Sequence, residues 1–322
     1  MTTPLIVPPR QAPTTFMGFP LCTDLDGMTA DVAIIGMPYG APYSMDEGGG
    51  GQDQVFAPTA VRAESGRISM GPDQYDFDLG GAMLDGRDVS VVDCGDVPGD
   101  HHAPDSHYAR AEQAARKIIG AGAMIITIGG DHGVPIPVFR ALEDSVTQGP
   151  ITLVHIDAHL DWRDEVNGVT EGYSSPIRRA SEMPWFGPIT QIGLRGQGSA
   201  RTREVDDAVA YGADLIAAHE LHAMGMDAVL ERIPDGGPYY LSVDADGMDP
   251  TEMPAVAAPA PGGVSYQQMR TLIHGLAAKG PVLGMDIVEI TPKRDLNGIT
   301  CLTAGRLIVN LIGAALRAGQ FD

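Results

Sequence analysis

Acidic and imidazole side chains follow an apolar run in the segment HIDAHLD. Asp157, His159 and Asp161 come directly at the end of ITLVHI. Residues two apart on an extended backbone point the same way, so these three groups face one side at the end of a strand. Several like charges at one point need a compensating partner. We therefore interpret the three residues as metal ligands rather than as hydrogen-bonding loop residues.

Two further segments repeat this pattern. Asp244 and Asp246 follow the apolar run in YYLSVDADGMDP, and His132 follows another in GGDH, where the two glycines permit a tight turn. Because active sites of α/β sheets lie at the carboxyl ends of strands, we expect the three segments to meet. The expected metal ligands are His132, Asp157, His159, Asp161, Asp244 and Asp246.

Four carboxylates and two imidazoles without sulfur suit hard to borderline divalent ions, with Mn²⁺ first and Ni²⁺ as the main alternative. Two dications would offset four carboxylate charges, whereas one would leave a net-negative buried cluster. We therefore expect a binuclear site. A water shared by two such ions is acidified far enough to act as a nucleophile at neutral pH.

The remaining chain supplies elements that can position these groups. Apolar runs that predict buried strands are Val32–Ile35, Val89–Val92, Met124–Ile128, Ile151–Ile156, Tyr239–Val243 and Val282–Met285. Stretches that predict helices are Ser106–Ile119, Val134–Glu143, Thr202–Tyr211, Met226–Arg232 and Ser265–Ala278. Loops are expected at Tyr39–Gln54, Asp161–Pro188 and Pro254–Gly263. Alternating strands and helices predict an α/β fold with a parallel sheet covered by helices, in one continuous domain.

Composition narrows the class of protein. The 322 residues carry 42 acidic and 21 basic side chains, a net charge of −21 that disfavours nucleic acid and anionic membrane surfaces as partners. Three cysteines without CxxC spacing indicate no disulfide framework. The N-terminus lacks a secretory pattern, and no uninterrupted apolar run reaches the ~18 residues of a membrane span. We expect a cytoplasmic protein.

Motifs along nearly the whole chain resemble the ureohydrolase family of arginases, agmatinases and guanidino-acid amidinohydrolases. Besides GGDH, DAHLD and SVDADGMDP, they include IGMPY at Ile35–Tyr39, FAPTAVRAES at Phe56–Ser65, VDCGDV at Val92–Val97 and GMDIVEITP at Gly284–Pro292. The resemblance implies a single three-layer α/β/α domain over residues 31–322 after an N-terminal extension of residues 1–30. It also implies a trimer or hexamer, with a hetero-oligomer as an alternative.

The resemblance assigns roles as well. It implies that the six ligands hold two manganese ions, that a bridging hydroxide attacks the guanidinium carbon to release urea, and that Glu289 grips the guanidinium. Departures from the family pattern bear on the substrate. Tyr173 stands where most relatives carry a proton-shuttling histidine, and tyrosine, with a reference pKa near 10, is a poorer shuttle. The catalytic candidates are thus Asp161, Glu289 and Tyr173.

Trp162 and Arg163, the two residues that directly follow the ligand motif, are expected to contact the part of the substrate beyond its guanidino group. Trp162 and Arg163 stand where relatives carry small or amide residues. An arginine there would repel the ammonium of agmatine and attract a carboxylate, unless it pairs with Asp164 or Glu165. Because the loops around Gly40–Pro58 and Pro254–Pro259 also differ from the family pattern, guanidine, an alkylguanidine or a biguanide such as metformin is an alternative to a guanidino acid.

Other functions explain fewer residues. DADG at Asp244–Gly247 resembles the nucleophile motif of haloacid-dehalogenase-like phosphatases, but that assignment leaves DAHLD unused. A calcium loop fails because Met248 and Asp249 occupy required ligand and glycine positions. A deacylase with one zinc on Asp157, His159 and Asp244 would not need the other ligands. A non-catalytic partner subunit would fit the missing histidine but not the complete ligand set.

Overall fold

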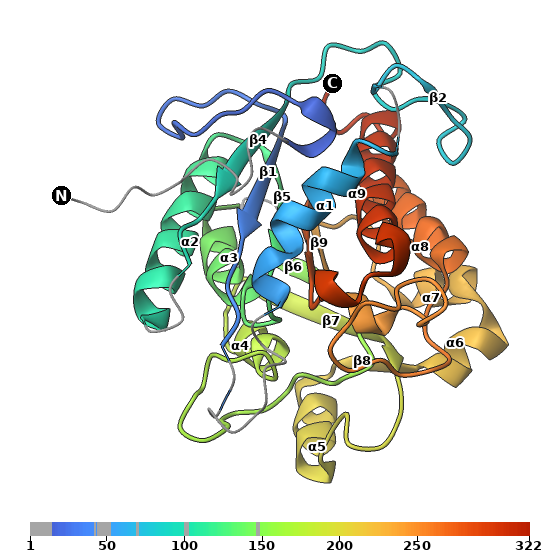
Figure 1. Cartoon of the computed structure of the whole chain (residues 1–322). Helices are drawn as coiled ribbons and strands as arrows, with labels where there is room; N and C mark the ends of the chain where they lie inside the picture. Colours follow the sequence, from blue (N-terminus) through green and yellow to red (C-terminus); the bar gives the residue numbers. More distant parts are fainter. Residues whose placement is uncertain (1–14, 42, 44–52, 69–70, 100–102, 146–148) are drawn as a thin grey trace.

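An eight-stranded parallel sheet lies at the centre of the molecule (Figure 1). The computed structural model describes residues 15–41, 43, 53–68, 71–99, 103–145 and 149–322. The strands of this sheet, in spatial order, are β4 (Val91–Asp96), β1 (Val32–Met37), β5 (Met124–Gly129), β10 (Val282–Val288), β9 (Tyr239–Asp244), β6 (Ile151–Ile156), β7 (Phe186–Leu194) and β8 (Asp214–Ala217). A short antiparallel hairpin pairs β2 (Tyr75–Asp76) with β3 (Gly81–Ala82).

All six predicted strands are confirmed, because each contains an apolar run that the parallel sheet and its helices bury. The Val89–Val92 run begins two residues later than predicted and extends to Asp96. The sequence analysis did not predict β7 or β8. Gly187 and Pro188 interrupt the apolar pattern of β7 near its start, and β8 has only four residues.

Helices cover both faces of the sheet and give the three layers (Figure 1). One face carries α2 (Pro104–Gly120), α3 (Pro135–Ala141) and α4 (Pro176–Ser181), which pack on one another. The other carries α1 (Ala57–Ser65), α6 (Ala218–Met224), α7 (Met226–Arg232), α8 (Tyr266–Lys279) and α9 (Ile299–Arg317). Helix α5 (Thr202–Tyr211) buries Ala208 in the same core as α2 and α3.

The five predicted helices are confirmed within about one turn. The long helix α9 was not predicted, because its apolar and β-branched residues obscure the helical period. Within the described residues, Leu296–Arg317 is long and apolar enough for a membrane span by composition alone, and 83% of its apolar stretch is buried inside the protein. It packs against α1 and α8, which is the position of a core helix.

The three predicted loops agree with the structure only in part. The expected loop Asp161–Pro188 is wrong in part, since it contains α4 and the beginning of β7. Pro254–Gly263 is irregular as predicted. Most of Tyr39–Gln54 and the first 14 residues of the expected N-terminal extension lie outside the described residues. After those residues, Phe16 is fully buried and its backbone N–H donates to Asp93 Oδ2 at 2.8 Å.

The sheet order explains where a site can form. β5, β10, β9 and β6 are adjacent and parallel, so their carboxyl ends lie side by side on one edge. The segments that follow these four strands carry, respectively, His132, Glu289, Asp246 and Asp157. Residues more than 150 positions apart in the chain therefore meet, at the edge where parallel α/β sheets usually bind ligands.

Candidate metal centre and active site

The turn after β5 places His132. Gly130 lies so close to Tyr39 that a Cβ on it would be 1.6 Å from the Tyr39 carbonyl oxygen, so only glycine fits there. The two oxygens of Asp131 accept the Gly133 N–H at 3.0 Å and the Ala41 N–H at 2.9 Å. This fixed turn directs the His132 imidazole into the protein, where 1% of it is exposed.

The segment after β6 places three of the six predicted ligands. Asp157 is fully buried and its Oδ1 accepts the His159 N–H at 2.6 Å. Asp161 has φ +50°, a left-handed conformation that is uncommon for a residue other than glycine. Strained backbone of this kind clusters at functional sites, where the surrounding structure maintains it.

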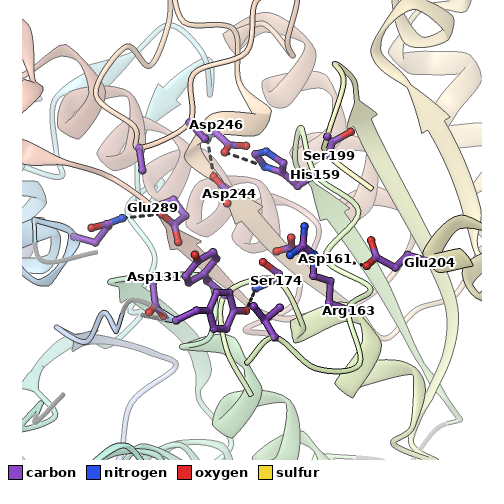
Figure 2. Close-up of a pocket in the computed structure, with 17 residues that line it drawn as sticks. Asp131, His159, Asp161, Arg163, Ser174, Ser199, Glu204, Asp244, Asp246 and Glu289 are labelled. Atoms are coloured by element: carbon purple, nitrogen blue, oxygen red, sulfur yellow. Dashed lines mark hydrogen bonds and ion pairs between the residues drawn. The ribbon is translucent and has the colours of Figure 1, made fainter. Parts of the chain in front are cut away.

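The segment after β9 places the other two carboxylates. Asp244 caps a short 3-10 turn, η5 (Ala245–Gly247), by accepting the Asp246 N–H at 2.7 Å. Arg195 fixes the same turn, since its guanidinium donates to the carbonyl oxygens of Asp246 at 2.5 Å and Met248 at 3.1 Å. Both carboxylates are 3% exposed and line the same cavity (Figure 2).

The six groups form two clusters that share Asp157. In the first, His132 Nδ1 is 3.3 Å from Asp157 Oδ2, 3.0 Å from Asp161 Oδ2 and 3.2 Å from Asp244 Oδ2. In the second, His159 Nδ1 is 3.3 Å from Asp157 Oδ1 and 3.1 Å from Asp246 Oδ2. Neighbouring donors on an octahedral ion with bonds of about 2.1 Å are about 3 Å apart. The spacing of both clusters therefore fits metal ions.

Electrostatics supports the same interpretation. Burial, together with the neighbouring carboxylates, raises the pKa of Asp161, of Asp244 and of Asp246, the last to about 6. His132 Nδ1 is buried and makes no well-aligned hydrogen bond to the described residues, although carboxylate oxygens of Asp157, Asp161 and Asp244 lie 3.3, 3.0 and 3.2 Å from it. Buried polar atoms without a partner are costly. A pair of dications would supply the missing partners and offset the negative charge.

A second layer of side chains orients the ligands. His132 Nε2 lies 3.2 Å from Ser242 Oγ, and that hydroxyl donates to Asp286 Oδ1 at 2.9 Å. With Nε2 engaged in this chain, Nδ1 is the nitrogen free to face the carboxylates. The sequence analysis missed Ser242 and Asp286. Ser242 is two residues before Asp244 on the same strand face, and Asp286 is an acid inside an apolar strand, so strand parity was the available signal.

His155 is fully buried beside the first cluster. Its Nδ1 is 2.9 Å from Gln191 Nε2, and its Nε2 is 3.0 Å from Asp157 Oδ2. The Gln191 amide nitrogen donates, so Nδ1 accepts and Nε2 carries the proton that faces Asp157. His155 lies within ligand distance of the first cluster, yet this pairing makes it a support for Asp157.

Glu289 occupies the end of β10 and completes one wall of the cavity. Its φ is +64°, and its N–H donates to Gly130 O at 2.8 Å. Glu289 Oε1 accepts the His132 N–H at 2.8 Å and Oε2 accepts Gln54 Nε2 at 2.9 Å. Burial and the charge of Asp131 raise the pKa of Glu289 to about 8. A cationic group that entered the cavity would stabilise the ionised carboxylate.

The cavity has a volume of about 500 Å³ and opens above both clusters. Comparisons with known proteins agree with this geometry: a model of the arginase family matches residues 30–313. The chain belongs to the arginase family. Its fold and catalytic class are those of this family of hydrolases.

Individual relatives cover almost the entire arginase-family chain. It is 30% identical over 294 residues to a guanidinobutyrase of Pseudomonas aeruginosa, covering 90% of this chain and 87% of that protein. It is 30% identical over 324 residues to the proclavaminate amidinohydrolase of Streptomyces clavuligerus, covering 97% and 96%. The solved structure of that amidinohydrolase superposes with a TM-score of 0.79, covering 98% of this chain and 100% of that one.

Only some of the residues predicted to contact the substrate line the cavity of this arginase-family chain. Tyr173 and Arg163 line the cavity, Tyr173 beside Tyr43 with ring centroids 4.3 Å apart. The placement of Trp162 at the substrate is wrong: its side chain is 2% exposed, packs against Tyr211 and lies among core residues. Trp162 is large and apolar, so the alternation that turns Arg163 toward the cavity buries Trp162 in the core.

Arg163 has a partner that the sequence analysis did not consider. Its Nε lies 3.6 Å from Glu204 Oε1, and both side chains line the cavity (Figure 2). Asp164, one of the expected partners, instead pairs with Arg179 at 2.7 Å. Glu204 lies in the first turn of α5 and its other oxygen accepts the Arg201 N–H at 2.8 Å, so the pair is anchored to the start of that helix.

Proposed function

We propose that this chain is a binuclear-metal amidinohydrolase that cleaves a C–N bond of a small guanidino compound and releases urea and an amine. The observation that carries the proposal is that both ligand clusters and Glu289 face one cavity. The residues of the two clusters would hold the metal ions at the cavity, and Glu289 would hold the guanidino nitrogens. The names of the relatives, guanidinobutyrase and proclavaminate amidinohydrolase, support the same bond type.

We propose that the metals are two divalent cations, with Mn²⁺ first and Ni²⁺ as the alternative, because the donors are oxygen and nitrogen without sulfur. His132, Asp157, Asp161 and Asp244 would hold one ion, and Asp157, His159 and Asp246 the other. Bound there, the pair would supply Lewis acidity and lower the pKa of water.

The protein's own residues then orient the substrate and manage protons. Glu289, anchored by the His132 N–H and by Gln54, presents a fixed carboxylate to a guanidinium. Hydrolysis adds one water across the C–N bond, and the departing nitrogen must gain a proton. Asp161 borders both cluster and cavity and can hold that proton on a carboxylate oxygen. The Tyr173 hydroxyl can donate a hydrogen bond to the leaving nitrogen, replacing the contact of the missing histidine.

We propose a short, uncharged substituent on the substrate, as in an alkylguanidine or a biguanide. Arg163 and Glu204 form an ion pair on the cavity wall, so each neutralises the charge of the other. Neither side chain then offers an unpaired charge to bind an ammonium or a carboxylate on the substrate. The neighbouring wall is apolar, with Val166, Ala257 and Ala258. A guanidino acid is the second candidate, because Arg163 would become available if Glu204 turned away.

A urea-release screen tests the proposal. Guanidine, methylated guanidines, metformin, agmatine and guanidino acids would be incubated with purified chain loaded separately with Mn²⁺ and Ni²⁺. We expect urea from at least one compound and two metal ions per active chain. One zinc per chain with amide cleavage would instead support the deacylase. Urea release only after a second, different chain is added would support the partner-subunit hypothesis.

Substitution of Arg163 by alanine tests the wall. Because Glu204 then remains as an uncompensated acid on the cavity, we expect kcat/KM for carboxylate-tailed guanidines to fall about tenfold more than for neutral ones. Steady-state kinetics over the same panel measures the difference. Arg203→Ala, an exposed change on α5, is the matched control. Equal losses for acidic and neutral substrates would remove Arg163 from substrate selection.

We also propose a cytoplasmic homo-oligomer. The three cysteines, Cys22, Cys94 and Cys301, are free thiols, which is usual in a reducing compartment.

A further inference from the structure

Gln54 lies beside the guanidinium-binding carboxylate, in the turn that precedes α1. It belongs to the short helix η3 (Gln54–Phe56), and its side chain is 3% exposed and lines the cavity. Its Nε2 donates to Glu289 Oε2 at 2.9 Å, the bond that the dashed line at Glu289 marks in Figure 2. Gln54 is not among the predicted site residues, although it lies in a loop whose sequence departs from the family pattern.

The orientation of this amide is fixed by its chemistry. A bound guanidinium favours the ionised form of Glu289, which can only accept hydrogen bonds, so the group facing Oε2 is then the amide NH₂, as it is in the structure. The amide oxygen therefore points away from Glu289. Gln54 Oε1 is buried and has no hydrogen-bond partner among the described residues. Because Gln54 lines the cavity, a ligand bound there can supply the donor that this buried acceptor lacks.

Contacts on both sides of Gln54 hold it in place. Asp53 Oδ2 accepts the Lys293 N–H at 3.0 Å, and Lys293 Nζ lies 5.1 Å from the centre of the Phe56 ring. Lys293 is four residues after Glu289, so the two segments that carry the amide and the carboxylate are tied together twice. The amide is thus preorganised, and little side-chain entropy is lost when a ligand binds it.

We propose that Gln54 is a substrate-binding residue whose Oε1 accepts a hydrogen bond from an N–H of the guanidino group held by Glu289. This inference rests on the proposed amidinohydrolase function. A guanidinium carries its N–H donors in a plane and offers no acceptor, so a carboxylate beside an amide oxygen matches it, and the neutral amide adds a donor requirement without adding charge. The site then selects substrates whose guanidino nitrogen carries an N–H toward Gln54 Oε1. A methyl group in place of that hydrogen leaves Oε1 without a hydrogen bond.

Gln54→Met tests the role, since methionine preserves the length of the side chain but lacks the amide. We expect kcat/KM for the substrate identified by the screen to fall about 10- to 100-fold, mainly through KM, because a hydrogen bond to a charged group is lost. Metal content should stay at the wild-type value. Gln267→Met, at an exposed position on α8, is the matched control and should remain within about twofold of wild type.

A second measurement separates substrate contact from support of Glu289. Inhibition constants of N-methylguanidinium and N,N′-dimethylguanidinium would be compared in wild type and Gln54→Met. We expect wild type to lose about tenfold in affinity on the second methylation and the variant to lose less than about twofold. Equal losses in both proteins would overturn the proposal.

Two further outcomes keep this inference separate from the proposed function. Wild-type activity with an unchanged Gln54→Met variant would overturn the role of Gln54 and leave the function standing, whereas absence of urea from every compound with wild type would contradict the function itself. If Gln54→Met does not fold, Gln54→Asn replaces it in the test. Asparagine keeps the amide group but moves it back from the cavity by the length of one methylene. Wild-type kcat/KM in that variant would equally overturn the proposal.

Discussion

Asp157→Asn is expected to lower urea release by about 10³-fold or more and to reduce bound metal from two ions per chain to one or fewer. Asp157 faces both imidazole ligands, with one oxygen 3.3 Å from His132 Nδ1 and the other 3.3 Å from His159 Nδ1. Asparagine preserves the shape but removes the negative charge shared by the two clusters. Elemental analysis and urea release measure the two effects on the same sample.

Folding supplies the control for this substitution. Burial raises the pKa of Asp157, but hydrogen bonds from His132, His155 and His159 hold it well below its usual range, so the metal-free variant is expected to be less stable than metal-free wild type, and each protein is compared with its own metal-free form. Added Mn²⁺ should raise the Tm of wild type much more than that of Asp157→Asn, since binding to the folded state alone stabilises it. Asp206→Asn, an exposed change on α5, should behave as wild type. Turnover with full metal loading in Asp157→Asn would contradict the binuclear assignment.

Glu289→Gln is expected to lower kcat/KM by about 10²- to 10³-fold while both metal ions remain bound. The substitution leaves an oxygen for the His132 N–H but removes the anion that a buried guanidinium needs as its partner. A guanidinium in that position would be an uncompensated buried charge. Steady-state kinetics gives the loss, and elemental analysis shows that the ligands are intact.

The matched control for this variant is Glu231→Gln, which makes the same chemical change on the exposed surface of α7. Normal turnover in Glu289→Gln would show that the guanidino group is held elsewhere in the cavity. Loss of metal from Glu289→Gln would show instead that Glu289 acts by fixing the turn of His132. The two results therefore distinguish a substrate grip from support of the metal cluster.

The local sequence alone was sufficient to predict that the six expected metal ligands gather at one edge of the sheet, because each lies at or just after the end of an apolar strand and the carboxyl end of a parallel strand is a common ligand position. These are short-range properties of the chain. The expected side-chain alternation does not explain the segment after β6, since Asp157, His159 and Asp161 follow the strand in irregular backbone and Asp161 has a left-handed conformation. The assignment of Glu289, by contrast, came from resemblance to the family, since nothing in its own strand distinguishes it from a surface acid.

Tertiary structure alone decided which groups face one another. The order β5, β10, β9, β6 brings Glu289 between the ligand segments, and that order depends on packing of helices against the whole sheet. The same packing buries Trp162 in the core, pairs Arg163 with Glu204 and places Gln54 at Glu289 across 235 positions of sequence. Contacts between distant segments leave no periodic signal in the sequence, so these contacts could not be predicted from it. The sequence therefore determined which chemical groups the site contains, and the fold determined which side chains form the wall of the cavity.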